Sequence, residues 1–310
     1  MDQVPELSLR DYTHGSEEEK LRFTHSLFEG LKLYGFIILK DHPVDRQLLK
    51  NAYDLSAKLF ALPEEKKSAY VGPSGGVRGY TPFGKEHAKN NPLPDLKEFW
   101  HVGRDVSPMH RLKDAFPDNI WPEELPEFKA NFQNLFSALD DTGRIMLQAL
   151  TIPLGVDKDF FTRMTDTGSS ILRLLHYPPV PANTPAGCVR AAAHEDINLI
   201  TLLVSASGGG LELLTREGQW LAIDTSPDNI IVDSGDMLAR ITNHLIPATT
   251  HRVVNPSGPN VSRYSMPFFM HPNPDAVLSC LPSCRGDNVR YPDITAQEFL
   301  HERLREIGLL

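Results

Sequence analysis

Apolar positions divide the chain into a first part with helical spacing and a second part made of short apolar runs. Within residues 23–31 the apolar side chains recur at helical spacing, and Ser16 and Glu19 just before them form a capping-box signature. A second amphipathic helix is predicted over residues 48–60. Between the two helices, the β-branched run GFIIL from Gly35 predicts a buried strand.

The second part of the chain begins with one long predicted helix and continues as strands. Residues 128–150 place apolar side chains at steps of three and four, which is typical of an amphipathic helix that supports a core. After Ser169 come the short apolar runs ILRLLHY, NLITLLV, GLELLT, WLAI, NIIVD, MLARI, THRVV and RYSMPFFM. Gly, Pro, Asn and Asp separate these runs, which favours an antiparallel sandwich or jelly roll over a parallel sheet. The residues from Thr295 onward again predict a helix.

These elements predict a mainly β protein with helical flanks, built on a jelly-roll core. We expect residues 1–120 to form an N-terminal region of helices and strands that packs on the core. Residues 121–310 are expected to hold the support helix, the jelly roll and the C-terminal helix. No linker rich in Gly, Ser or Pro separates the two regions, so we expect one cooperative unit.

Residues 72–104 show no sustained period and are rich in Gly, Pro, Asn and Lys. The segment is too long for an ordinary connection. Its aromatic side chains favour an ordered loop that packs on the rest of the protein. We therefore expect the segment to lie over the functional site and to take part in substrate selection. The candidate substrate contacts are Tyr80, Phe99, Trp100 and His101.

Composition and charge exclude several classes of protein. A chain of 310 residues can bury a core without disulfides, and its net charge of −9 is spread without a basic block, so nucleic acid is not an expected partner. No apolar run approaches the roughly 18 to 20 residues that span a bilayer, so we expect no membrane partner. The N-terminus lacks a signal-peptide pattern, so we expect a cytoplasmic protein. The sequence does not indicate its oligomeric state.

The cysteines do not predict a disulfide framework. Cys188, Cys280 and Cys284 make an odd number in a long chain, and no second Cys or His pair stands at zinc-finger spacing from Cys280 and Cys284. We expect three reduced, structural thiols.

His194 and Asp196 are candidate metal ligands because side chains at positions i and i+2 of an extended backbone project to the same side. His251 opens a later predicted strand, and a jelly roll brings such distant strands together. Two imidazoles and one carboxylate that leave one face open are typical of non-haem Fe(II) oxygenases. A His-x-Asp pair alone also occurs in solvated turns, so the assignment depends on its context.

Arg263 and Ser265 supply that context, because they share one face of the last predicted strand. A guanidinium pairs with both oxygens of a carboxylate, and a neighbouring hydroxyl donates a further hydrogen bond. A metal with open positions and a carboxylate anchor in one β core together predict a dicarboxylate co-substrate that joins them.

The motifs GFIIL, RLLHYPP, AAAHEDINLITLL, GGGLELL, DSGDMLARITN, TTHRVVNP and RYSMPFFMHPNPD follow one another across most of the chain. With the ligand set, they make the chain resemble the 2-oxoglutarate-dependent oxygenases of the isopenicillin N synthase-like branch. The resemblance implies a double-stranded β-helix (cupin-like jelly-roll) core. It also implies catalytic Fe(II) bound by His194, Asp196 and His251, and 2-oxoglutarate bound by Arg263 and Ser265.

The activity that the resemblance implies couples two oxidations by O2. Decarboxylation of 2-oxoglutarate to succinate and CO2 accompanies hydroxylation of a small molecule, or its desaturation or cyclisation. Two alternatives remain open. One is an oxidase of the isopenicillin N synthase kind, in which Arg263 and Ser265 hold the substrate's own carboxylate and no 2-oxoglutarate is consumed. The other is a jelly-roll protein that binds a metal or ligand without catalysis.

The chain departs from the family pattern in two places. Glu195 stands where the family usually has Thr, and strand alternation turns it away from the metal. Leu175 and His176 precede Tyr177, where plant members often carry an Asn, but the retained phenol can hydrogen-bond the co-substrate. Arg173 shares the face of Tyr177, and a buried arginine requires an anion. That anion is a protein carboxylate, 2-oxoglutarate or substrate, so Arg173 is a candidate contact for either ligand.

Overall fold

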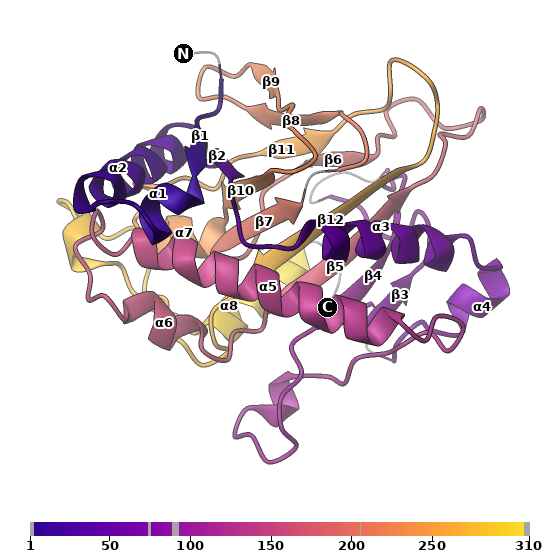
Figure 1. Ribbon diagram of the computed structural model, residues 1–310, viewed down its shortest axis with the longest axis horizontal. Helices are drawn as coiled ribbons and strands as arrows, with labels where there is room; N and C mark the ends of the chain where they lie inside the picture. Colours follow the sequence, from indigo (N-terminus) through magenta and orange to yellow (C-terminus); the bar gives the residue numbers. More distant parts are fainter. Residues whose placement is uncertain (1–2, 74–75, 89–92, 205, 307–310) are drawn as a thin grey trace.

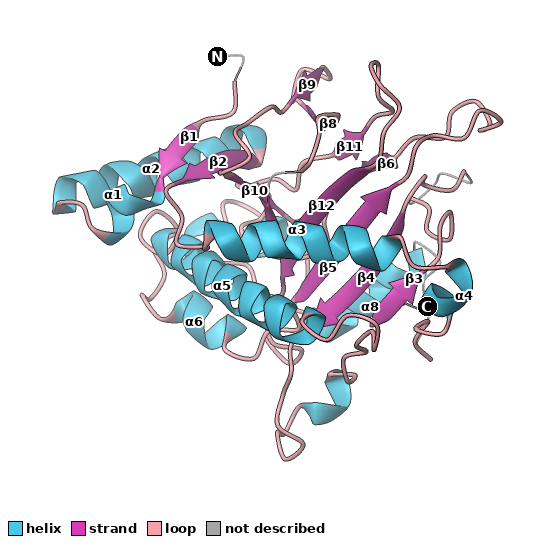
Figure 2. Cartoon of the chain, turned by 45° about the vertical axis from the view of Figure 1, so that its right-hand side comes forward, coloured by secondary structure: helices cyan, strands magenta, loops and turns pink. Residues whose placement is uncertain are grey.

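Two β-sheets face one another, and helices cover the outer face of the larger sheet (Figures 1 and 2). The computed structural model describes residues 3–73, 76–88, 93–204 and 206–306. The longer helices are α2 (Glu17–Tyr34), α3 (Arg46–Phe60), α5 (Phe128–Ala149) and α8 (Ala296–Glu306). The shorter helices are α1 (Leu9–Thr13), α4 (Glu64–Ser68), α6 (Phe160–Thr165) and α7 (Asp236–Ile241).

The larger sheet has eight strands in the order β1-β2-β10-β7-β12-β5-β4-β3. Their bounds are β1 Glu6–Ser8, β2 Phe36–Lys40, β10 Ile230–Ser234, β7 Ile200–Val204, β12 Arg263–Met270, β5 Ile171–Tyr177, β4 Glu98–Gly103 and β3 Gly79–Thr81. The smaller sheet has the order β6-β11-β8-β9, with β6 Ala191–His194, β11 His251–Val253, β8 Leu211–Leu214 and β9 Trp220–Ala222. Strands β1 and β2 run parallel, and the other registered pairs are antiparallel. This is the predicted jelly roll with helical flanks.

Local sequence signals fix the ends of the predicted helices. At the start of α2 the Ser16 side chain accepts a hydrogen bond from Glu19 N, and the Glu19 carboxylate accepts one from Ser16 N, which completes the capping box. The same helix ends at Gly35, whose φ of 67° is left-handed and whose N–H bonds to Leu31 O. A Cβ atom at Gly35 would lie 2.1 Å from Thr249 Oγ1, so only glycine fits this turn into β2.

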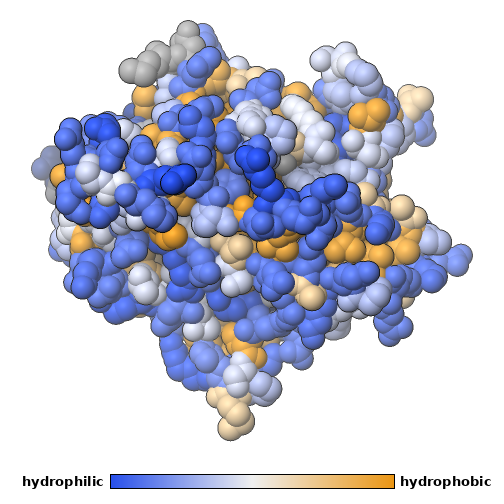
Figure 3. All heavy atoms as spheres, in the orientation of Figure 1, coloured by the Kyte–Doolittle hydropathy of each residue, from blue (hydrophilic) through white to orange (hydrophobic). Residues whose placement is uncertain are grey.

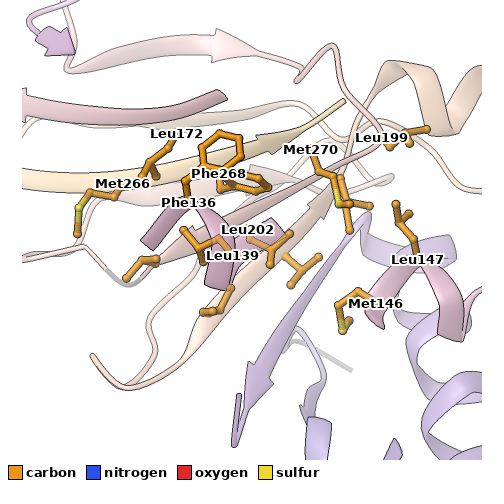
Figure 4. Packing of buried hydrophobic residues seen from close by; sticks show 14 of the residues in the cluster. Phe136, Leu139, Met146, Leu147, Leu172, Leu199, Leu202, Met266, Phe268 and Met270 are labelled. Atoms are coloured by element: carbon orange, nitrogen blue, oxygen red, sulfur yellow. The ribbon is translucent and has the colours of Figure 1, made fainter. Parts of the chain in front are cut away.

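Strand alternation sorts the larger sheet into two faces with separate hydrophobic clusters. The outer face meets α5, and Figure 4 shows its packing. The side chains labelled there are Phe136, Leu139, Met146, Leu147, Leu172, Leu199, Leu202, Met266, Phe268 and Met270. The inner face, with Phe36, Ile38, Phe99, Leu175 and Tyr177, meets Leu211, Leu213 and Val253 of the smaller sheet. The functional residues considered below project into this inner layer.

The helices predicted over residues 48–60, over 128–150 and from Thr295 correspond to α3, α5 and α8, so these predictions are confirmed. One predicted strand is wrong, because the run MLARI forms most of α7. Gly235 begins that helix with an extended backbone, and a short apolar run cannot by itself distinguish a strand from a buried helical turn.

The segment 72–104 is also more regular than predicted, since it contains β3 and β4; its residues 74–75 and 89–92 lie outside the described part of the chain. The face of the molecule in Figure 3 is mostly hydrophilic, with apolar atoms in scattered groups. Among the described residues, no helix combines the length and the hydropathy needed to cross a bilayer.

Candidate active site

The three predicted metal ligands lie together at one end of the smaller sheet. His194 ends β6, His251 begins β11, and the antiparallel register pairs the two residues directly. Asp196 follows β6 by two residues, so its side chain returns to the same side. The candidate ligand atoms of all three residues lie within 4.8 Å of one another. The structure therefore brings together the set that sequence spacing predicted.

Hydrogen bonds orient each of these side chains. His194 Nδ1 lies 2.8 Å from Ala192 O, and His251 Nδ1 lies 3.1 Å from Thr249 O. Because a carbonyl only accepts, each Nδ1 carries the proton, and the Nε2 lone pairs remain for a metal. The Nε2 atoms lie 3.8 Å (His194) and 3.9 Å (His251) from Asp196 Oδ1.

Thr201 fixes the third side chain. Its hydroxyl donates a hydrogen bond to Asp196 Oδ2, which leaves Oδ1 as the atom that faces the histidines. The same hydroxyl oxygen accepts a hydrogen bond of 2.8 Å from Asn198 Nδ2, so its direction is fixed from behind. The sequence analysis missed Thr201. Thr201 and Leu203 are two residues apart on β7, so they share the inner face of the sheet.

Burial sets the protonation states around the cluster. Burial, aided by the neighbouring His251, lowers the pKa of His194 to about 4, so this imidazole is neutral at neutral pH. Burial and the Asp196 carboxylate raise the pKa of Asp233 to about 8; its Oδ2 lies 3.7 Å from His251 Nδ1. Against the effect of burial, the Asp196 and Asp233 carboxylates raise the pKa of His251. A metal would compete with a proton at His251, because a neutral imidazole is the form that binds a metal. Two imidazole nitrogens and one carboxylate oxygen are a donor set that suits non-haem Fe(II).

The candidate carboxylate anchor lies on β12 beside β5. Arg263 pairs in register with Tyr177, and Ser265 pairs with Leu175. The Arg263 Nε donates to Gly208 O at 3.0 Å and to Gly209 O at 3.1 Å, and Nη1 lies 3.4 Å from Ser265 Oγ. Arg263 is buried, yet no carboxylate of the described residues pairs with it. A buried guanidinium without a protein counter-ion requires an anion from a ligand.

Both groups line one cavity between the two sheets. The triad, Arg263, Ser265 and Tyr177 border it together with Lys97, Arg173, Leu203, Val253 and Phe269. Its other walls are mainly apolar, as is usual for a site that binds a small molecule. A second cavity of about 560 Å³ lies between α3 and the β7–β8 and β9–β10 connections. The two cavities share Leu203, Leu211, Ile231 and Arg263.

Arg173 combines an ion pair with a place on the cavity wall. Its Nη1 lies 3.2 Å from Glu86 Oε1, and its Nε donates to His101 Nε2 at 2.7 Å. His101 is neutral because burial, and then the charge of Arg173, lower its pKa. Lys97 extends the group, with its Nζ 3.2 Å from Glu86 Oε1 and 2.8 Å from Asp95 Oδ2. Sequence reasoning missed Glu86 and Lys97, because the segment that carries them shows no period.

The four residues predicted as substrate contacts divide between the two faces of the sheet. Phe99 belongs to the inner cluster, and His101 contacts Arg173. Tyr80 and Trp100 belong to the outer core and are fully buried there, so the prediction that they contact substrate is wrong. The reason is register: Tyr80 pairs with Trp100 on adjacent strands, and alternation turns both away from the cavity.

The end of the segment 72–104 nevertheless adjoins the site. Asp95 Oδ1 accepts a hydrogen bond of 2.9 Å from Ala192 N, two residues before His194. The backbone N–H of Leu96 bonds to Val189 O at 3.0 Å. These contacts attach the segment to β6 and place Lys97 on the cavity wall.

Comparison with known proteins agrees with this geometry. Residues 168–272 match the model of the 2OG-Fe(II) oxygenase superfamily, and residues 4–124 match the model of the non-haem dioxygenase in morphine synthesis N-terminal region. A 2-oxoglutarate-Fe(II) type oxidoreductase of Aspergillus fumigatus is 33% identical over 305 residues, which cover 95% of this chain and 90% of the relative. The chain therefore belongs to the 2-oxoglutarate–Fe(II) oxygenase superfamily.

Solved structures give the same result. A 2OG-Fe(II) oxygenase family protein of Caulobacter crescentus superposes with a TM-score of 0.90 at 44% identity, covering 99% of this chain and 100% of that one. A full-length Neurospora crassa protein in complex with alpha-KG and thymine gives a TM-score of 0.87 at 32% identity, covering 97% and 96%. The predictions of family, fold class and cofactors are confirmed: the protein is a 2-oxoglutarate-dependent dioxygenase that uses Fe(II), 2-oxoglutarate and O2.

Proposed function

We propose that His194, Asp196 and His251 hold the Fe(II), and that Arg263 and Ser265 hold the far carboxylate of 2-oxoglutarate. The observation that carries this assignment is the pairing of two groups in one cavity: a three-donor cluster and a buried arginine without a protein counter-ion among the described residues. A dicarboxylate with a keto group complements both at once.

When iron and 2-oxoglutarate are bound, they supply the activation of O2 and the oxidation of a C–H bond, with succinate and CO2 as the products of the co-substrate. The chain's own residues bind and orient. Ala192 O and Thr249 O hold the two imidazoles in one tautomer, and Thr201 directs one oxygen of Asp196 toward them. Leu203 and Val253 add apolar surface to the cavity that the triad and Arg263 share, and apolar surface limits access of water.

We propose hydroxylation of a small molecule as the reaction, with desaturation or cyclisation as the outcomes that the same oxidation can give. The similar Neurospora crassa structures contain thymine in one case and 5-formyluracil in another. We propose a substrate of comparable size for this chain, and no role for nucleic acid or a membrane. We also propose a reducing compartment such as the cytoplasm, which agrees with the three free cysteines.

The experiment measures succinate formation from 2-oxoglutarate under air, with and without added Fe(II), in the presence of small-molecule candidates. The proposed assignment predicts iron-dependent succinate release that a chelator stops. Oxidation of a substrate without loss of 2-oxoglutarate would instead indicate the oxidase alternative. Absence of 2-oxoglutarate binding by iron-loaded protein would contradict the assignment of Arg263 and Ser265.

A further inference from the structure

Arg173 presents a fixed hydrogen-bonding edge to the cavity that holds the metal-ligand cluster. Its guanidinium carbon lies 4.3 Å from the ring centre of Phe99 and 5.3 Å from that of Phe269. With Nε bonded to His101 and Nη1 paired with Glu86, the group has little freedom to rotate. The Nη2 group has no hydrogen-bond partner within the part of the chain that the structure describes. A rigid donor on a cavity wall is a feature that recognises a ligand.

The charges around Arg173 determine which ligand suits that donor. Two cations, Arg173 and Lys97, are matched by two carboxylates, Glu86 and Asp95, through ion pairs of 3.2, 3.2 and 2.8 Å. Although burial alone would raise the pKa of Glu86, Arg173 and Lys97 lower it, so this carboxylate is charged. A substrate carboxylate would therefore meet no unmatched cation here, and burying its charge would be unfavourable. A neutral carbonyl oxygen can accept a hydrogen bond from Nη2 without changing the balance of charges around Arg173.

A further observation narrows the shape of the ligand. On the cavity wall next to Arg173, Phe269 and Pro267 offer apolar surfaces to a flat ring.

We propose that this chain oxidises a neutral, planar ring that carries a carbonyl group, and that Arg173 recognises its carbonyl oxygen. The inference rests on the proposed function, because it assigns the substrate of that site. Phe269 packs against the ring, and Glu86 and Lys97 keep the Arg173 guanidinium in position. A ring of this kind with a methyl group would offer the site a C–H bond to oxidise.

The test uses three methylated rings of similar size with the anaerobic complex of the full chain, Fe(II) and 2-oxoglutarate. Thymine carries a cyclic imide, 3-methylbenzoate carries a carboxylate, and toluene carries no polar group. Equilibrium dialysis measures the affinity of each ring without any turnover. The metal-to-ligand absorption of the same complex measures 2-oxoglutarate binding separately. We expect thymine to bind at least tenfold more tightly than either of the other rings.

Three variants assign the effect to Arg173. Arg173→Gln should weaken thymine binding by about tenfold to a hundredfold, the effect of losing one charge-assisted hydrogen bond. Arg173→Lys keeps the charge toward Glu86 and should recover only part of that affinity, because an ammonium lacks the planar fork. The matched control is Arg104→Gln. Arg104 is also paired with a carboxylate and lies 5.4 Å from the ring of Phe136, but on the outer face of the sheet. The control should leave thymine binding unchanged.

The outcomes separate this inference from the proposed function. Equal binding of 3-methylbenzoate and thymine, thymine binding unaffected by Arg173→Gln, or no thymine binding by a complex that holds 2-oxoglutarate would each overturn the substrate class alone. If Arg173→Gln weakens 2-oxoglutarate as much as thymine, Arg173 serves the co-substrate and the inference is wrong. If the wild type does not bind 2-oxoglutarate at all, the proposed function fails and the inference fails with it.

Discussion

Arg263 faces Tyr177 across the β12–β5 ladder, and its guanidinium carbon lies 5.1 Å from the centre of the tyrosine ring. The ring is buried on the inner face, so it holds the guanidinium against one wall of the cavity and shields it from water. Two glycine carbonyls bind Nε, which leaves the terminal nitrogens to face a ligand. The cation is thus prepared for a carboxylate before the carboxylate arrives.

We predict that Arg263→Ala raises the dissociation constant of 2-oxoglutarate at least tenfold. The variant leaves the far carboxylate desolvated and unpaired, a loss of roughly 2 to 5 kcal/mol for a buried charge pair. Arg263→Lys should restore only part of the affinity for 2-oxoglutarate. Ser265→Ala should weaken 2-oxoglutarate binding by about 1 kcal/mol, because one hydroxyl hydrogen bond is lost. Titration of the metal-to-ligand absorption of the anaerobic Fe(II) protein measures each affinity.

The control for this series is Arg144→Ala. Arg144 pairs with Asp140 on α5 and is not among the residues that line the cavity, so its loss should leave 2-oxoglutarate affinity unchanged. Unchanged affinity in Arg263→Ala as well would contradict the co-substrate assignment and favour the oxidase alternative, in which this arginine serves the substrate.

We predict that His194→Ala and Asp196→Ala each abolish turnover and sharply weaken iron binding, because a three-ligand site cannot hold a labile divalent ion with two. The fold should persist, since the β core does not depend on the metal. Glu195→Ala is the matched control: its carboxylate turns outward and accepts a hydrogen bond of 2.9 Å from Thr250, so iron content should not change. Iron analysis with circular dichroism tests all three, and full activity in iron-loaded Asp196→Ala would refute the metal assignment.

We predict that Thr201→Val weakens iron binding about tenfold to a hundredfold, although Thr201 is not itself a ligand. The valine fills the same space but removes the hydroxyl that orients Asp196. Thr201→Ser keeps the hydroxyl and should restore most of the affinity. Competition with a chromophoric chelator gives the affinities, and loss of iron binding in the serine variant equal to that in the valine variant would show that packing, not the hydroxyl, matters.

The sequence predicted the parts of the site that depend on local geometry. His194 with Asp196, and Arg263 with Ser265, share a face because extended backbone alternates, and this property does not depend on the rest of the fold. Prediction from the sequence failed where the pairing of distant strands determines which face of the sheet a side chain takes. Tyr80 and Trp100 are apolar in an aperiodic segment, so nothing in the segment shows which face each will take. Glu86 and Arg173 lie 87 positions apart, and only the folded loop brings them together.

We predict that residues 1–120 and 121–310 unfold in one transition. Strand β2 pairs with β10, and β4 pairs with β5, so each region supplies strands to the same eight-stranded sheet. Removing either region would expose the sheet's apolar faces and its unpaired backbone groups. Calorimetry should therefore give equal calorimetric and van't Hoff enthalpies for the metal-free protein. Two resolved transitions would contradict the prediction of one cooperative unit.

We predict that His271 makes the protein less stable in mild acid. Burial lowers the pKa of this imidazole to about 4, against the opposing charge of Asp196, and its Nδ1 has no partner among the described residues. In the unfolded chain a histidine titrates near about 6.5. As the pH falls from about 6.5 toward 4, the unfolded state takes up a proton that the folded state does not, so stability declines by up to about 1.4 kcal/mol per pH unit.

Above about pH 6.5 both states hold His271 neutral, so the free energy of unfolding carries no penalty from this residue. By pH 4 the penalty lowers the free energy of unfolding by roughly 3 kcal/mol. Urea unfolding of the metal-free protein at several pH values in this window measures the slope. His271→Gln carries no titrating group, so its stability should decline less steeply than that of the wild type over the same range. His14→Gln is the control, because His14 is exposed and its replacement should leave the slope as it is. If the wild type and His271→Gln lose stability in parallel, the imidazole is not buried in its neutral form, and the acid sensitivity must come from other groups.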